Sequence, residues 1–559
     1  MLSGSALGPA REAPARWAGL RQVARPGGVP RGSVVKRDCR YLRCVYRPEG
    51  RVTWCGGWGA RRAGSGDHGV VTEPHHPDPR RWKALAVTLT AGFMGLLDVS
   101  IVNVALPSIQ KGIGGDAGTA QWVVSGYALT FGLVLVSGGR LGDALGRRRM
   151  FLVALASFVA MSAFAGAAPT GEVLVVARLL QGCAAGMLTP QNSGLIQDLF
   201  RGDERGKAFG VFGSVVGIST AVGPVLGGAI IALFGEEQGW RWVFFVNVPI
   251  GVLAFVLALR LLPKARGRRA RLRDEIDFPG VLLLGLAVLC VLLPLVESEQ
   301  DGLRTLWWLF PIAAVLGVAF VRWERRVVSR DRPPLMDIRL FTRTPGYSPG
   351  AAIGATYFCG FAGIWLVFAM FFQQGLGYTP LESGLAVTPF AVGSAVSAAV
   401  AGRLVGRWGR RLTVTGLSLV AAALGTVALL AWLVPGEHFG LVITLPLLIG
   451  GIGGGMVISP NTTLTLECVP TSTAGVAGGA LQTGQRIGTA IGTAVLASVF
   501  RAVLPASGDP FPTALALSMV CAMGFVLVAL AFGVLELRAR RARVPNSQLL
   551  SATTAAPYE

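Results

Sequence analysis

GRLGDALGRRR, Gly139 to Arg149, forms a glycine-rich and strongly basic turn between two long apolar runs. A degraded copy, GRLVGRWGRR, lies at Gly402 to Arg411, offset by 263 residues. The matching positions are Gly139/Gly402, Arg140/Arg403, Leu141/Leu404, Gly146/Gly409, Arg147/Arg410 and Arg148/Arg411. A motif that recurs so far along the chain predicts that the second half of the protein repeats the first.

The repeat extends beyond the basic turn. At an offset of 269 residues, ten positions in 182–223 match ten in 451–492, with Asp198 matched by Glu467. The matches include Gly206 with Gly475 and Gly223 with Gly492. We therefore expect two bundles of six helices, with the unmatched segment between them as an insertion.

The composition points to a membrane. Of the 559 residues 52% are hydrophobic and 14% charged, and the mean hydropathy is +0.56, whereas soluble domains average about 25% charged residues. The net charge of +21 could suggest a nucleic-acid partner. However, the basic residues occur in short clusters between apolar runs, which fits orientation in a bilayer better than a nucleic-acid surface.

Fourteen apolar runs follow Lys83, and each has about the ~20 residues that cross a ~30 Å hydrocarbon core. They are roughly 84–106, 121–139, 150–168, 173–195, 208–234, 242–262, 278–296, 305–323, 350–372, 384–404, 412–433, 440–460, 475–500 and 512–535. Strands do not suit runs of this length. The predicted class is an all-α polytopic membrane protein with fourteen transmembrane helices.

Five regions follow from this pattern. They are a disordered basic extension at 1–81, a first bundle at 82–262, a linker with two extra helices at 263–346, a second bundle at 347–536 and a tail at 537–559. Upstream DNA translated from a start codon chosen too early is an alternative explanation of the extension. Lys and Arg gather in alternate connecting segments, which predicts a bacterial cytoplasmic membrane protein with both termini in the cytoplasm.

An acidic and a basic residue lie at similar depth in two predicted spans of the first bundle. Asp98 is the acidic residue well inside the first run, and Arg178 lies in the fourth at a similar depth. A carboxylate at this depth costs about 2.5–3.5 kcal/mol on insertion scales, which favours a functional role. We expect a switchable ion pair in which a proton and a cationic or apolar substrate compete for Asp98. A static pair that only orders two helices is the alternative.

Several motifs occur in the order typical of one family. These are the two basic turns, LDVSIVNVALP in the first run, RLLQG in the fourth and a GPxxGG motif in the fifth. Together they resemble the major facilitator superfamily, specifically its fourteen-helix drug:proton antiporter branch. The resemblance implies the major facilitator fold and proton-coupled export by alternating access.

The resemblance also assigns roles to residues. It implies proton coupling by Asp98 and Arg178. The conformational loop would comprise Gly139, Arg140, Asp143, Gly146 and Arg147, with Asp143 against the N-terminus of a neighbouring helix. The antiporter motif would comprise Gly217, Gly223, Pro224, Gly227 and Gly228.

Other chemistry has little support in the sequence. The eight cysteines form no CxxC pair and no Walker motif occurs, so we expect no metal and no cofactor, with the proton motive force as energy source. We expect a monomer whose partners are protons, the lipid bilayer and a small-molecule substrate, a lipophilic or cationic drug or metabolite. A dedicated exporter of one secondary metabolite or siderophore is the first alternative, and a non-transporting membrane sensor the second. Arg486, in the thirteenth run, could snorkel, contact a lipid phosphate or face the cavity.

Overall fold

The computed structural model describes residues 78–113, 117–235, 237–263, 276–298, 302–330, 332–504 and 510–542. All described residues belong to one compact unit of the chain, Glu73–Glu559. The predicted disorder of 1–81 therefore lies outside the described residues apart from 78–81, as does the tail beyond residue 542.

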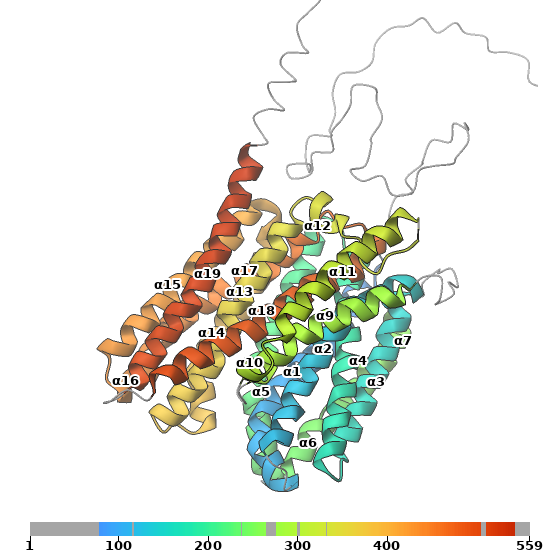
Figure 1. Cartoon of the computed structure of the whole chain (residues 1–559). Helices are drawn as coiled ribbons and strands as arrows, with labels where there is room; N and C mark the ends of the chain where they lie inside the picture. The colour runs from blue at the N-terminus through green and yellow to red at the C-terminus, as the bar shows by residue number, and fades with distance from the viewer. Residues whose placement is uncertain are drawn as a thin grey trace, which may run out of the picture. The chain divides into compact units, whose positions relative to one another are not determined.

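The first bundle is formed by helices α1 to α7 (Figure 1). Their bounds are α1 (Arg81–Ile113), α2 (Ala117–Leu145), α3 (Arg147–Gly166), α4 (Gly171–Leu199), α5 (Asp203–Phe234), α6 (Gly239–Phe245) and α7 (Asn247–Leu261). The sixth apolar run thus forms two helices that meet at Val246. Pro249 explains the break, because a proline ring clashes with the carbonyl four residues earlier, here that of Phe245, where α6 ends.

The inserted segment supplies two long helices, α9 (Phe278–Val296) and α11 (Leu309–Ser329), and two short ones, α10 (Gly302–Thr305) and α12 (Arg339–Arg343). α9 packs along α11 and also contacts α2 and α18 (Ala474–Val503), one helix from each bundle. The insertion therefore lies against the place where the two bundles meet (Figure 1).

The second bundle follows the same plan. Its elements are α13 (Tyr347–Met370), the π-helix η2 (Phe371–Gly375), α14 (Pro380–Trp408), α15 (Arg410–Leu433), α16 (Gly436–Val442), α17 (Thr444–Thr465), the 3-10 turn η3 (Thr471–Thr473), α18 and α19 (Phe511–Ala542). Every regular element among the described residues is helical, which confirms the all-α prediction.

Twelve helices in the described part of the chain are long and apolar enough to cross a membrane. The two expected runs outside this set form α5 and α11, of 32 and 21 residues. α5 includes positions whose side chains are not described, and the last third of α11 is charged, with Arg322, Glu324, Arg325 and Arg326. Twelve spans are thus supported, and fourteen stays a prediction.

Each basic turn contains a glycine whose backbone conformation only glycine adopts readily. Gly146 has φ 98° and Gly409 has φ 54°, and each precedes the first residue of a helix, α3 or α15. A side chain in this left-handed region is strained, so glycine allows the chain to reverse within one residue. We refer to the end of the helices that holds these two turns as the basic end.

The two bundles meet along two seams near the basic end. In the α2–α18 seam, a Cβ on Gly139 would lie 2.3 Å from the carbonyl oxygen of Gly475. In the α5–α14 seam, a Cβ on Gly402 would lie 2.5 Å from the Cα of Gly210 and 2.6 Å from the carbonyl oxygen of Gly206. Backbone therefore packs on backbone in both seams, which close this end of the molecule.

Candidate functional site

Asp98 and Arg178 form an ion pair in the centre of the first bundle. Arg178 Nη1 lies 2.5 Å from Asp98 Oδ2, and the two side chains are 1% and 0% exposed. The structure thus brings together the two residues that the sequence placed at similar depth. Because each charge has its partner, the pair avoids the cost of an uncompensated buried charge.

Two polar side chains that we did not predict, Gln181 and Asn247, hydrogen-bond to Asp98, and a third, Ser162, holds Asn247. Asp98 Oδ1 accepts from Gln181 Nε2 at 3.0 Å and from Asn247 Nδ2 at 3.1 Å. Asn247 Nδ2 also donates to Ser162 Oγ at 3.1 Å. Gln181 could have been found, since it is the glutamine of the RLLQG motif; Asn247 and Ser162 are ordinary polar residues in apolar runs and carry no comparable signal.

The guanidinium of Arg178 is fixed from the other side by α2. Arg178 Nε donates to the backbone oxygen of Val123 at 2.9 Å, and Arg178 Cζ lies 4.2 Å from the centre of the Tyr127 ring. Tyr127 in turn donates to the backbone oxygen of Gly95 at 3.2 Å. The ion pair and its partners thereby join α1, α2, α3, α4 and α7, all within the first bundle.

The antiporter motif lies along α5 and faces two different helices. A Cβ on Gly223 would lie 2.2 Å from Ser100 Cβ, and one on Gly227 would lie 3.0 Å from Ile101 Cγ1, so both glycines let α5 approach α1 just beyond Asp98. Gly217 faces the backbone of α14, where a Cβ on it would lie 3.1 Å from the backbone nitrogen of Ala395. Gly228 faces open space, and the side chain of Pro224 lies outside the described set.

Asp143, in the basic turn, reaches across the α2–α18 seam to the N-terminus of α18. Its carboxylate accepts from the backbone N–H of Gly475 at 3.1 Å and of Val476 at 2.9 Å. A carboxylate here interacts favourably with the positive end of the helix dipole. Arg140 lies half-buried in α2, close to the same seam.

Arg147 links the turn to both bundles. It pairs with Asp143 at 2.8 Å and with Asp198 at 2.5 Å, and donates to the backbone oxygen of Thr471 in the second bundle. Its counterpart Arg410 pairs with Glu536 of α19 at 2.7 Å and is 2% exposed. The two repeats therefore keep the arginine but change its carboxylate partners.

The position equivalent to Asp143 shows a second exchange. It is Gly406 in the second repeat, and a Cβ there would lie 2.4 Å from Oδ1 of Asp203, in the first turn of α5. In one seam the carboxylate comes from the turn, and in the other it comes from the helix N-terminus that faces the turn. Both carboxylates belong to the first bundle.

A small apolar cavity of about 50 Å³ lies between the bundles. Gly217 and Val216 of α5 line one side, and Phe361, Trp365 and Phe390 of α13 and α14 line the other. A residue of the predicted antiporter motif is thus part of the wall. The aromatic rings pack closely, with the Trp365 and Phe390 centroids 4.9 Å apart.

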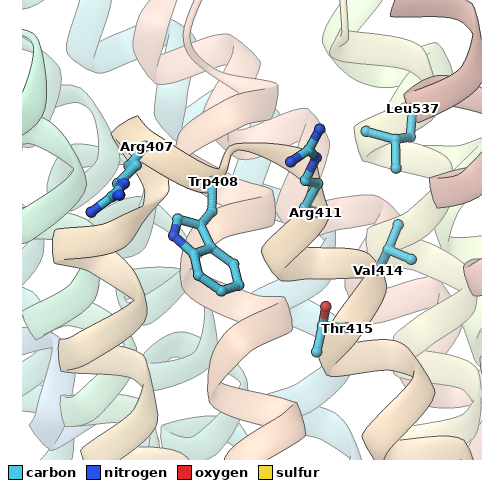
Figure 2. A pocket seen from close by; sticks show the side chains of 6 residues that line it. All are labelled: Arg407, Trp408, Arg411, Val414, Thr415 and Leu537. Atoms are coloured by element: carbon cyan, nitrogen blue, oxygen red, sulfur yellow. The ribbon is translucent and has the colours of Figure 1, made fainter. Parts of the chain in front are cut away.

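A second cavity, of about 500 Å³, lies at the basic end of the second bundle, where α14, α15 and α19 come together. Figure 2 shows Trp408 between Arg407 and Arg411, with Val414, Thr415 and Leu537 beside them. None of the residues predicted for transport lines this cavity.

Two helical bundles with an internal repeat, a buried ion pair in one of them and a cavity between them define a secondary transporter. The chain belongs to the major facilitator superfamily, whose family model matches residues 88–493. It is therefore a multi-pass membrane protein of a transporter family.

Curated relatives are close in sequence. The chain is 37% identical over 452 residues to the probable actinorhodin transporter of Streptomyces coelicolor, covering 79% of this chain and 76% of that protein. It is 37% identical over 436 residues to the puromycin resistance protein pur8 of Streptomyces alboniger, covering 76% and 82%. Among solved structures, the human organic anion transporter MFSD10 (TETRAN) matches with a TM-score of 0.59 at 14% identity, covering 82% of this chain and 100% of that one, which shows the fold alone.

Proposed function

We propose that this protein is a proton-coupled exporter that moves a lipophilic drug or metabolite out of a bacterial cell by alternating access. The observation that carries the proposal is the Asp98–Arg178 ion pair, which is buried within predicted spans and held by further hydrogen bonds on both sides. The names of the two relatives, a transporter and a resistance protein, support the direction of transport.

Coupling would proceed through helix packing. Asp98 has no exposed surface in this conformation, so a direct exchange of proton for substrate on its carboxylate, as we expected from the sequence, has no support here. Protonation would remove the charge that holds Arg178 and loosen the contacts of α1 with α4 and α7. α5 packs on α1 through Gly223 and on α14 through Gly217, so it would carry that change to the α5–α14 seam.

The basic end would face the cytoplasm, with both termini on that side, because positive residues are retained there. In this orientation the two seams close the cytoplasmic side, and the conformation is one whose transport pathway is shut toward the cell interior. A proton arriving from outside would then reach Asp98 before the seams open.

The test uses inside-out vesicles with an acidified lumen. Adding a transported compound should release protons from the lumen of wild-type vesicles, and Asp98→Asn should abolish this release. Glu382→Gln alters an exposed carboxylate in the first turn of α14, at the end of that helix opposite the basic turn, and should leave transport unchanged. Equal proton release by wild type and Asp98→Asn would refute the coupling role.

A dedicated exporter of one endogenous compound is the second candidate. It is favoured by the relatives, since each is named for a single compound. Transport of one aromatic metabolite, with no transport of any compound in a broad drug panel, would support this candidate over multidrug export.

A further inference from the structure

We propose that the exported compound is an aromatic acid and that Arg486 of α18 binds its ionised group. The inference rests on the proposed export function and names the class of its substrate. It narrows the lipophilic or cationic cargo expected from the sequence to a lipophilic anion.

Arg486 is a cation of the second bundle with no counter-ion among the described residues. It lies twelve residues after the start of α18, roughly 18 Å along the helix at 1.5 Å per residue. In the part of the chain that the structure describes, no ion pair and no hydrogen bond involves its guanidinium. Arg486 is partly buried, whereas the buried Arg178 and Arg410 each pair with a carboxylate.

The guanidinium of Arg486 points across the seam instead of toward a membrane surface. Its Cζ lies 4.4 Å from the centre of the Phe131 ring of α2, in the first bundle. A ring face offsets only part of the cost of burying a charge, about 2 kcal/mol when desolvated. The packing on Phe131 argues against snorkelling, and leaves an anionic ligand as the partner that would complete the site.

The same ring system reaches the proton-coupling pair. Phe131 and Tyr127 lie 6.1 Å apart on α2, and Arg178 stacks on the other ring, that of Tyr127. The rings of Phe131 and Tyr127 would therefore connect an anion bound by Arg486 to Arg178, the partner of Asp98. Ligand and proton would act on the same face of α2.

Two polar groups of α13 supply a second observation, and one of them, that of Trp365, lines the cavity. Trp365 Nε1 and the Tyr357 hydroxyl, both on α13, are buried without a hydrogen-bond partner among the described residues. The indole N–H is only a donor, and the hydroxyl can donate. α13 packs along α18, so these two groups and Arg486 lie on neighbouring helices. A ligand rich in acceptor oxygens would satisfy them.

The rings of Phe361, Trp365 and Phe390 line the cavity and indicate what the uncharged part of the ligand is like. Aromatic side chains favour flat aromatic surfaces by offset stacking and edge contacts. A flat aromatic compound that carries a carboxylate or phenolate combines both features. Exchange of one such monoanion for one proton would move two positive charges inward, so transport would respond strongly to membrane potential.

The experiment compares three probes in inside-out vesicles with an acidic lumen: 1-hydroxy-2-naphthoate, its methyl ester and tetraphenylphosphonium. We expect wild type to accumulate the naphthoate, faster with a lumen-positive potential. Arg486→Gln should reduce naphthoate uptake at least about tenfold, with Arg486→Lys intermediate. Arg501→Gln, in the last turn of α18, is the matched control and should have no effect.

The outcomes separate this inference from the proposed function. Wild-type transport of tetraphenylphosphonium without naphthoate transport would overturn the substrate class and leave proton-coupled export intact. Equal loss of all probes in Arg486→Gln would assign Arg486 a structural role and overturn its binding role. Absence of wild-type transport for every probe would count against both proposals, while selective loss of naphthoate uptake in Arg486→Gln would support the inference.

Discussion

At the scale of single residues, the carboxylate of Asp98 has the most consequences. It accepts from Arg178, Gln181 and Asn247, so one side chain on α1 orders side chains on α4 and α7. Such a group can serve as a switch because its protonation weakens several contacts at once.

Asp98→Asn should destabilise the protein as well as stop proton coupling, because it leaves Arg178 buried without a counter-ion. Breaking a buried pair from one side costs about 3–5 kcal/mol. The double variant with Arg178→Gln should recover most of this loss and still fail to transport. Thermal unfolding in detergent measures the first effect and vesicle assays the second. A double variant no more stable than the single one would contradict this account.

At the scale of helices, the glycines of α5 set how closely α5 approaches its neighbours. Gly223 lies against Ser100, whereas Gly228, five residues along the same motif, faces open space. A substitution at Gly223 therefore tests close helix packing, and the same substitution at Gly228 serves as its control.

We expect Gly223→Ala to force α5 away from α1 and to lower the transport rate at least about tenfold, since overpacking costs about 1–3 kcal/mol. Gly228→Ala should transport like wild type. Rates in vesicles at matched protein levels make the comparison. Equal activity of the two variants would show that the motif does not act through close packing.

Gly406→Asp restores the residue of the first repeat and should weaken the α5–α14 seam, because the new carboxylate would face Asp203. The repulsion is exposed, so we expect only about 0.2–1 kcal/mol, decreasing with salt. Asp203→Asn in the same chain should remove the effect. Labelling of Ser459→Cys in a cysteine-free background by a water-soluble maleimide would report opening of this seam, since Ser459 is buried beside Gly213.

At the scale of the whole molecule, the carboxylate of Asp143 stabilises the conformation with a closed basic end. Asp143→Asn should shift the equilibrium toward the open state by about tenfold, since a charged hydrogen bond contributes about 1.5–3 kcal/mol. Spin labels at Arg149 and Arg411 should then show a larger population of long distances. Asp198→Asn, which alters another partner of Arg147 within the first bundle, should have a smaller effect.

Much of this architecture could be predicted from the sequence, because apolar runs and repeated glycines are properties of the chain alone. The family, the helical class and the proximity of Asp98 and Arg178 followed from run length, motif order and depth. The partners Gln181 and Asn247 did not, since helices that are apolar on all sides do not reveal their rotation. The division of the sixth run at Val246 was also missed, although Pro249 signalled it.

The pairing of Gly406 with Asp203 depends on which helix faces which turn, so the repeat alignment alone could not show it. It has a consequence for the history of the chain. Both seam carboxylates, Asp143 and Asp203, now belong to the first bundle, and the second bundle supplies what they face. A homodimer of two copies of residues 82–262 would bring these acids together. The two halves have become complementary, like the subunits of an obligate heterodimer, and the ancestral duplication can no longer be reversed by discarding one half.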